Sequence, residues 1–125
     1  MEDAQFSDEF CRFLQTTVPS VDAAELLLRL QRDPARWWSA AELTAAPLAE
    51  ADLARYLETF QARGLIANDP DQRVQYQPAS AVLDSYVRTL AQAYSERPVT
   101  LIRVIYALRD SKIRSFADAF KLRRS

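Results

Sequence analysis

Histidine is absent from the sequence, which removes the commonest metal ligand and the commonest general base. The single cysteine, Cys11, has no second cysteine for an internal disulfide and cannot build a zinc site alone. It lies beside Phe10 and Phe13 in a helical pattern, which favours a small buried apolar residue over a reactive thiol. We therefore expect no metal site.

Glycine is nearly absent as well, since the 125 residues include one, Gly64. A glycine-rich loop that cradles phosphate is therefore impossible. Without histidine, neither a Ser-His-Asp nor a Cys-His arrangement can be assembled. Carboxylate pairs such as Asp8 and Glu9 fall near expected helix N-termini, where the helix dipole favours negative charge. We expect that the protein is not an enzyme and holds no cofactor.

Long hydrophobic runs are missing too. No apolar run approaches the roughly 20 residues that a membrane-spanning helix needs. The first residues, Met1-Glu2-Asp3, are acidic where a signal peptide would be basic. These absences predict a cytoplasmic protein with no membrane association.

The residues that are present favour a mainly helical globular chain. Hydrophobic residues make up 49% of the sequence and charged residues 26%, which is ordinary for a folded protein. The length fits a single domain over residues 1–125. Capping residues and apolar periodicity predict helices over about residues 7–18, 22–33, 81–95, 98–109 and 113–122.

The middle of the chain predicts a series of short elements. The bulky Arg36-Trp37-Trp38 suits a short strand. Ser39-Ala40-Ala41-Glu42 matches a capping box, which opens a short helix that reaches about Ala45. The next helix runs from about Ala49 to Arg63, and its buried stripe is formed by Leu53, Tyr56, Leu57 and Phe60.

Gly64 follows this helix directly, at a position where a left-handed backbone favours glycine. Residues 65–68 then predict a strand, residues 69–72 a turn around Pro70, and residues 73–77 the returning strand. The predicted fold is therefore mainly α with a small β-hairpin. Its order is that of a winged helix-turn-helix unit with additional N- and C-terminal helices.

Over roughly residues 22–78 the chain resembles winged-helix regulators of the MarR and PadR kind. The likeness lies in Ser39-Ala-Ala-Glu-Leu43 at the short helix, and in Leu53, Leu57, Phe60 and Arg63-Gly-Leu-Ile66 at the longer one. It implies a winged-helix core over about residues 20–78 and a helical extension over about residues 80–125. Two C-terminal segments are similar to the ending of a group of small bacterial proteins, which implies no function: Glu96–Ile102 and Ser115–Arg123.

The resemblance implies a dimeric, DNA-binding transcriptional regulator from a bacterium. In such proteins the longer helix enters the major groove of double-stranded DNA and the hairpin approaches an adjacent groove or phosphate. Carried over to this chain, the residues that would face bases are Asp52, Arg55 and Thr59. Those that would contact the DNA backbone are Arg36, Arg63 and Arg73.

The charge of this surface departs from the family pattern. Thr59 is neutral where many such proteins carry arginine, and Ala51 and Asp52 stand where serine and threonine usually contact DNA. Phosphate neutralisation supplies most non-specific affinity for DNA, so this surface begins at a disadvantage. A second hypothesis is therefore a winged-helix adaptor that binds protein and not DNA. Further negative charge comes from Glu50, Glu58, Asp69 and Asp71.

Charge is also distributed unevenly along the chain. Residues 1–33 carry seven acidic and three basic side chains, a net charge of −4, and residues 34–97 carry eight and six, a net charge of −2. Residues 98–125 carry two acidic and seven basic side chains, a net charge of +5. This basic end indicates either nucleic-acid contact or a solvated helix face partly paired with the acidic N-terminal segment. The cations are Arg103, Arg109, Lys112, Arg114, Lys121, Arg123 and Arg124.

The stretch Val99–Leu108 is apolar except for Thr100 and Arg103. A helix of this kind must be buried on more than one side, either as a central core helix or as a subunit interface. The interface hypothesis predicts a homodimer, which would place two recognition helices on one duplex. Its contact residues would be Leu101, Ile102, Ile105, Leu108, Phe116 and Phe120.

Two further features leave alternatives open. Trp37 and Trp38 are neighbours on the predicted strand and so face opposite ways. One would join the core, and the other would be covered by the C-terminal helices or would anchor a partner. A third functional hypothesis is a small-molecule sensor with its pocket between the winged unit and the C-terminal helices, for which the sequence specifies no ligand.

Overall fold

The computed structural model describes residues 6–44 and 50–108 of the chain. Two short strands, β1 (Ile66–Asn68) and β2 (Val74–Tyr76), lie between the fourth and fifth labelled helices. The expected fold class, mainly α with a small β-hairpin, is confirmed. The helix predicted over residues 113–122 lies outside the described residues. The labelled helices are α1 (Asp8–Thr17), α2 (Val21–Arg32), α3 (Ala40–Leu43), α4 (Glu50–Ala62) and α5 (Ala81–Glu96), and residues 98–108 are helical as well.

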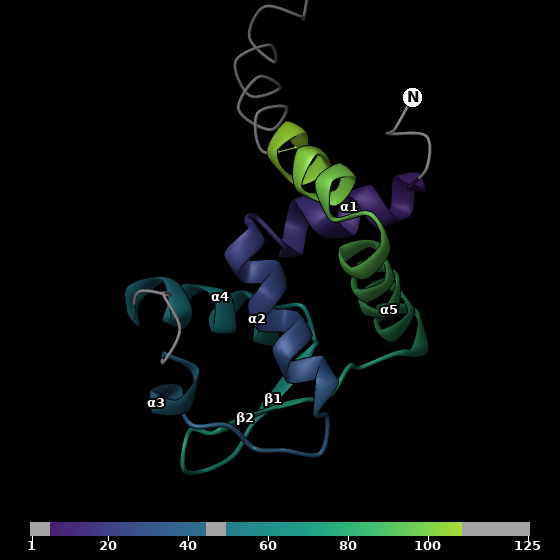
Figure 1. Cartoon of the computed structure of the whole chain (residues 1–125). Helices are drawn as coiled ribbons and strands as arrows, with labels where there is room; N and C mark the ends of the chain where they lie inside the picture. The colour runs from purple at the N-terminus through teal and green to yellow at the C-terminus, as the bar shows by residue number, and fades with distance from the viewer. Residues whose placement is uncertain (1–5, 45–49, 109–125) are drawn as a thin grey trace, which may run out of the picture.

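Helix α2 lies in the middle of the molecule, and the other elements surround it (Figure 1). Helix α5 packs against α2, and α1 packs against α5. The hairpin lies below α2 in Figure 1, with β2 against α2 and β1 against α4. Helices α3 and α4 lie on the side of α2 away from α5, so α4 and the hairpin form one edge of the molecule.

The helix starts are set by serine caps. The hydroxyls of Ser7, Ser20 and Ser80 each accept a hydrogen bond of 3.0 to 3.2 Å from the backbone N–H three residues further on. The capping box at α3 is complete. The Ser39 hydroxyl accepts from the Glu42 N–H at 3.2 Å, and the Glu42 carboxylate accepts from the Ser39 N–H at 2.8 Å. Each bond satisfies a backbone donor that the first helical turn leaves unpaired.

Gly64 turns the chain from α4 into the hairpin, as predicted. Its φ is 78°, in the left-handed region that favours glycine. The Leu65 N–H donates to the Phe60 carbonyl at 2.9 Å, and the Gly64 N–H donates to the Gln61 carbonyl at 3.1 Å. These two bonds form a Schellman motif, which satisfies carbonyls at the end of α4. A Cβ at this position would lie 3.3 Å from the Cβ of Ala79.

Strands β1 and β2 pair antiparallel, with Ile66 opposite Tyr76. Trp38 adds a bridge to β2, because Trp38 and Val74 each donate their N–H to the other's carbonyl at 2.8 Å. The strand expected over residues 36–38 is therefore reduced to this single bridge at Trp38. Arg36 does not pair with β2 through its N–H, because that N–H donates to the Asp33 carbonyl in the turn after α2. Both tryptophans are half-buried, and Trp38 packs against the core.

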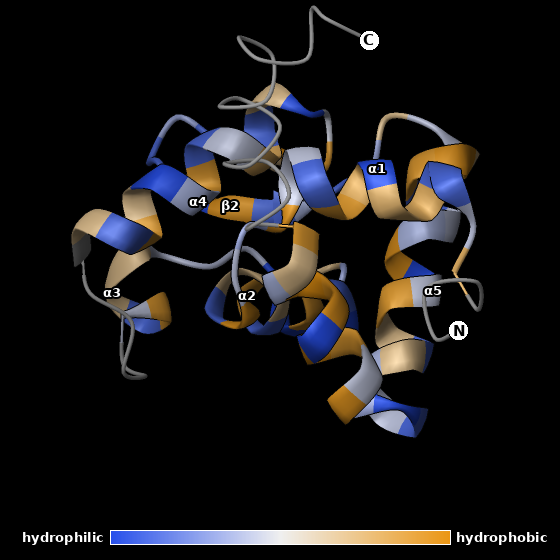
Figure 2. Cartoon of the chain, turned by 90° about the horizontal axis from the view of Figure 1, so that it is seen from above, coloured by the Kyte–Doolittle hydropathy of each residue, from blue (hydrophilic) through white to orange (hydrophobic). Residues whose placement is uncertain are grey.

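A hydrophobic cluster joins side chains from α1, α2, α4, the hairpin, α5 and residues 98–108. Leu27, Phe60 and Leu90 are fully buried in it. Figure 2 shows hydrophobic and hydrophilic residues alternating along the helices, as expected when one face of each packs inward. Burial of these apolar side chains is the main stabilising term of the fold. Within residues 6–44 and 50–108, no helix has the length and apolar character to cross a membrane.

Residues 98–108 contribute to the core of the single chain. Leu101 and Ile105, which the dimer hypothesis placed at an interface, are 0% and 2% exposed. Their spacing of four residues puts them on one face of the helix, and that face packs inward. These two residues therefore lie in the core of the chain, as the core-helix alternative expects. Of the other predicted interface residues, Ile102 and Leu108 are half-buried, whereas Phe116 and Phe120 lie outside the described residues.

Two tyrosine hydroxyls tie α5 to its neighbours. The Tyr76 hydroxyl on β2 donates to the Asp84 carboxylate at 2.8 Å, and the Tyr94 hydroxyl donates to the Glu25 carboxylate on α2 at 2.6 Å. Burial and the bond to Asp84 raise the pKa of Tyr76. The hydrogen bond to Glu25 raises the pKa of Tyr94. Both hydroxyls therefore stay protonated, as hydrogen-bond donors to carboxylates must.

Candidate functional site

The residues predicted to face DNA bases contact one another on α4. Arg55 and Asp52 form an ion pair across one turn of the helix. The Arg55 guanidinium also lies over the Tyr56 ring, 5.6 Å from its centroid. Thr59 donates its hydroxyl to the Arg55 backbone carbonyl at 3.1 Å. The positive charge of Arg55 is therefore balanced by the neighbouring Asp52 carboxylate.

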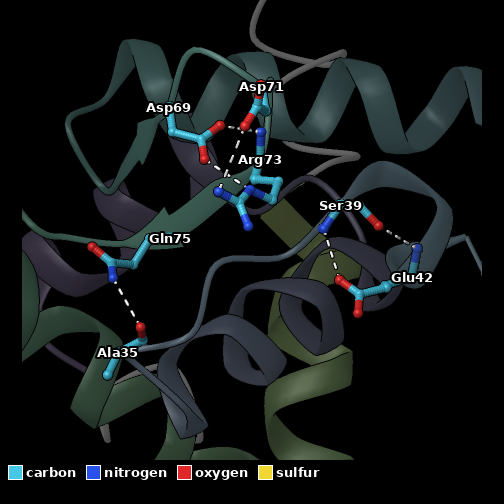
Figure 3. A network of polar contacts seen from close by, with 7 residues as sticks. All are labelled: Ala35, Ser39, Glu42, Asp69, Asp71, Arg73 and Gln75. Carbon is cyan, nitrogen blue, oxygen red and sulfur yellow. Dashed lines mark hydrogen bonds and ion pairs between the residues drawn. The ribbon is translucent and has the colours of Figure 1, made fainter.

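Arg73 at the tip of the hairpin has two carboxylate partners. Its Nε donates to the Asp69 carboxylate at 2.8 Å, and its Nη2 lies 3.8 Å from the Asp71 carboxylate (Figure 3). The Arg73 backbone N–H also donates to Asp69 at 2.7 Å. Desolvation acts to raise the pKa of Asp69, but the hydrogen bonds from Arg73 outweigh it and lower that pKa. Two carboxylates against one guanidinium give the tip a net negative charge.

Arg36 is paired as well. Its Nη2 lies 2.8 Å from the Glu42 carboxylate, and its guanidinium lies over the Trp38 ring, 3.8 Å from the centroid. Hydrogen bonds from the Ser39 N–H and from Arg36 lower the pKa of Glu42. Glu42, which completes the capping box of α3, is thus also the ion-pair partner of Arg36, a residue predicted to contact DNA phosphate.

The Trp38–Val74 bridge brings the Arg36 pair and the Arg73 cluster to the same edge of the hairpin, because antiparallel pairing places residue 39 opposite residue 73. The Gln75 side-chain amide also donates to the Ala35 carbonyl at 3.0 Å, which holds the segment after α2 against β2 (Figure 3). Together, three predicted DNA-contacting arginines are matched by four carboxylates.

Arg63 lies apart from these three arginines. It follows the last residue of α4, and its Nη2 donates to the Thr16 hydroxyl on α1 at 3.3 Å. The structure therefore brings Arg36 and Arg73 to one edge and places Arg63 against a different helix.

Between α4 and the hairpin lies a groove of about 410 Å³, which sequence reasoning missed. Three apolar side chains line it: Leu53, Leu57 and Val74. Among the described residues that line this groove, none is lysine or arginine. The remaining lining residues are Ala40, Ala54, Glu58, Gln61, Asn68 and Gln72.

Two groove residues stand out. Glu58 is exposed and has no ion-pair partner within residues 6–44 and 50–108, unlike Asp52 on the same helix. Gln72 has a φ of 65°, a left-handed conformation that residues other than glycine rarely adopt. One feature of the α4 sequence could have indicated the groove. Leu57 belongs to the predicted buried stripe, but it is half-buried because it faces the groove beside the small, exposed Ala54.

Comparison of the chain with models of protein families, with curated proteins and with solved structures found no match. The likeness to MarR and PadR regulators therefore rests on the residues quoted for it, and it stays a prediction.

Proposed function

We propose that this protein is a winged-helix adaptor that binds a segment of a partner protein in the groove between α4 and the hairpin. The observation that carries the proposal is the pairing of Arg36, Arg55 and Arg73 with carboxylates. A DNA-binding surface needs a surplus of cations to displace counterions from phosphates. Surface ion pairs are weak and can exchange partners, but exchange does not change the net charge of the surface.

The groove indicates the chemistry of the partner segment. Leu57, which is half-buried above the buried Leu53 and Val74, would contact an apolar anchor residue, as at the centre of protein interfaces. Glu58, which lacks a partner among the described residues, would pair with a lysine or arginine on the segment. The volume of about 410 Å³ falls within the range of about 300–1,000 Å³ that is typical of binding pockets. The partner segment therefore combines an apolar side chain with a nearby positive charge.

Gln72 lies in the same groove. Its left-handed backbone closes the hairpin turn, where its N–H donates to the Asp69 carbonyl at 2.9 Å. The Gln72 side chain is exposed, so its side-chain amide is available to a bound segment.

Selection from a displayed library of short peptides tests this proposal. The wild-type chain is the target, and Ala54→Arg, which fills the groove and neutralises its net charge, is the counter-target. Ala51→Arg is the matched control, because Ala51 is also exposed on α4 but does not line the groove. We expect enriched peptides with an apolar anchor and a basic residue that bind wild type and Ala51→Arg but not Ala54→Arg. Peptides that bind all three proteins equally would refute the groove as the site.

Glu58→Gln refines the test. We expect the selected peptides to lose affinity for this variant and to show weaker salt dependence, since one charge pair is removed.

A DNA-binding regulator is the second candidate function. The order of α3, α4 and the hairpin favours it, because it places a long helix and a β-ribbon on one edge of the molecule. The seven basic side chains of residues 98–125 would then have to supply the cations that α4 and the hairpin lack. This candidate includes the predicted homodimer, since two-fold pairing would present two copies of α4 to one duplex.

A further inference from the structure

A second hollow, of about 360 Å³, lies between α1, the end of α4 and α5. Ala62 and Arg63 line it from the end of α4, and Leu83 and Tyr86 line it from α5. Its volume is also within the range of pockets that hold small organic molecules. The α1 residues that line it recur at helical spacing on one face: Glu9, Arg12, Phe13, Thr16 and Thr17.

The two arginines of this hollow differ from those of α4 and the hairpin. Neither Arg12 nor Arg63 forms an ion pair within the described segments 6–44 and 50–108. Arg63 donates to the neutral Thr16 hydroxyl, which leaves its positive charge uncompensated there. Glu9 is the acidic residue in the lining, so the hollow carries a surplus of one positive charge.

Hydroxyl groups add further polar atoms to the lining. Thr17 is 1% exposed, and its hydroxyl shares a 3.3 Å hydrogen bond with the Thr16 hydroxyl. The Tyr86 hydroxyl has no hydrogen-bond partner in the described part of the chain, and it is in contact with solvent.

The rest of the lining is apolar. The rings of Phe13 and Tyr86 contact each other with centroids 5.2 Å apart, and Leu83 lies beside them in the lining. Polar and apolar residues therefore share the lining, and small-molecule sites likewise combine apolar walls with polar groups that orient the ligand.

We propose that this hollow binds a small organic anion. Its carboxylate or phosphate group lies between Arg12 and Arg63, and its apolar body lies against Phe13 and Leu83. Guanidinium groups donate paired hydrogen bonds to either kind of oxyanion, and their positive charge strengthens those bonds. The Tyr86 hydroxyl supplies an additional donor to the oxyanion, whereas the Thr16 hydroxyl donates to the Arg12 carbonyl at 2.9 Å.

Calorimetric titration of the full chain tests this proposal with three probes. Phenyl phosphate and phenylacetate present the two head groups on similar apolar bodies, and inorganic phosphate presents a head group alone. We expect at least one organic anion to bind more tightly than inorganic phosphate. The preferred probe identifies the head group.

Variants locate the site. Arg12→Gln and Arg63→Gln should each weaken binding by about tenfold or more, because each removes charged hydrogen bonds to the anion. Glu9→Gln should strengthen binding, because it removes a negative charge from the lining. Arg88→Gln is the control and should leave affinity unchanged, since Arg88 pairs with Asp84 and does not line the hollow.

Absence of heat from all three probes at millimolar concentration would overturn the proposal. Binding that Arg12→Gln and Arg63→Gln both leave unchanged would overturn it equally. Both arginines are exposed, so these substitutions should not disturb the fold. None of the residues changed here lines the groove between α4 and the hairpin, so the outcome is independent of peptide binding there.

Discussion

Tyr76 on β2 donates its hydroxyl to the Asp84 carboxylate in the first turn of α5, at 2.8 Å. Asp84 also pairs with Arg88 at 2.9 Å, so one carboxylate holds both the hairpin and its own helix. This contact fixes the hairpin, and with it one wall of the groove, relative to the rest of the chain. Its strength therefore bears on how well the groove is preorganised for a partner.

The Tyr76 contact makes stability depend on pH in the alkaline range. The pKa of Tyr76 is raised in the folded state above its ordinary value of 10.0, so folding favours the protonated hydroxyl. This contribution is fully present below pH 10 and is lost as pH rises toward the folded-state pKa. We expect Tyr76→Phe to lower the free energy of unfolding by about 1 kcal/mol at pH 7, and the deficit to shrink above pH 10.

Urea unfolding of both proteins at pH 7 and pH 10.5 measures this difference. Tyr106→Phe is the control, because Tyr106 is exposed and its hydroxyl has no partner in the described residues. A deficit for Tyr76→Phe that is the same at both pH values would contradict the assigned contact.

Gly64 should resist substitution. Alanine would be strained at its positive φ and would place a Cβ 3.3 Å from that of Ala79. We expect Gly64→Ala to lose about 1–2 kcal/mol of stability, and Gly64→Asn to lose less, because asparagine tolerates left-handed backbone. Denaturant midpoints of the two variants provide the comparison. An alanine variant as stable as wild type would mean that the turn after α4 differs from the one described.

Leu101 distinguishes a core helix from a subunit interface. Its side chain is fully buried in the single chain, so Leu101→Ala should cost about 2–5 kcal/mol at any protein concentration. Val99→Ala, at a position 66% exposed on the same helix, should change stability by less than about 0.5 kcal/mol. Thermal unfolding over a range of concentrations checks both. If Leu101→Ala instead turned a stable dimer into a folded monomer, its side chain would belong to an interface.

Local sequence features were enough to predict the elements, because their causes are local. Serine caps, the capping box at Ser39 and the glycine at position 64 each act within a few residues, and they placed helix and hairpin boundaries to within a few positions. For residues 98–108, the sequence alone does not distinguish an apolar face that packs in the core from one that forms a subunit interface. Periodicity identifies an apolar face, but it does not say which neighbour covers that face.

The charge pairing of the candidate surface was only partly visible in the sequence. Asp52 and Arg55 stand at helical spacing, so their contact could have been anticipated. The contact of Asp69 with Arg73 depends on the backbone of the hairpin turn, and the contact of Arg36 with Glu42 depends on the turn before α3. The groove itself requires the distance between α4 and the hairpin, which no local pattern contains.

The central claim is that paired arginines leave the edge formed by α4 and the hairpin unable to hold a duplex. Fluorescence anisotropy of a labelled random DNA duplex at low salt tests it most directly. The proposal predicts no binding by wild type, and a gain of salt-sensitive binding by the combined variant Asp52→Asn, Glu58→Gln, Asp71→Asn. Wild-type binding that weakens with salt, with a log–log slope of about −0.9 per phosphate contacted, and that Arg55→Ala abolishes would contradict the claim.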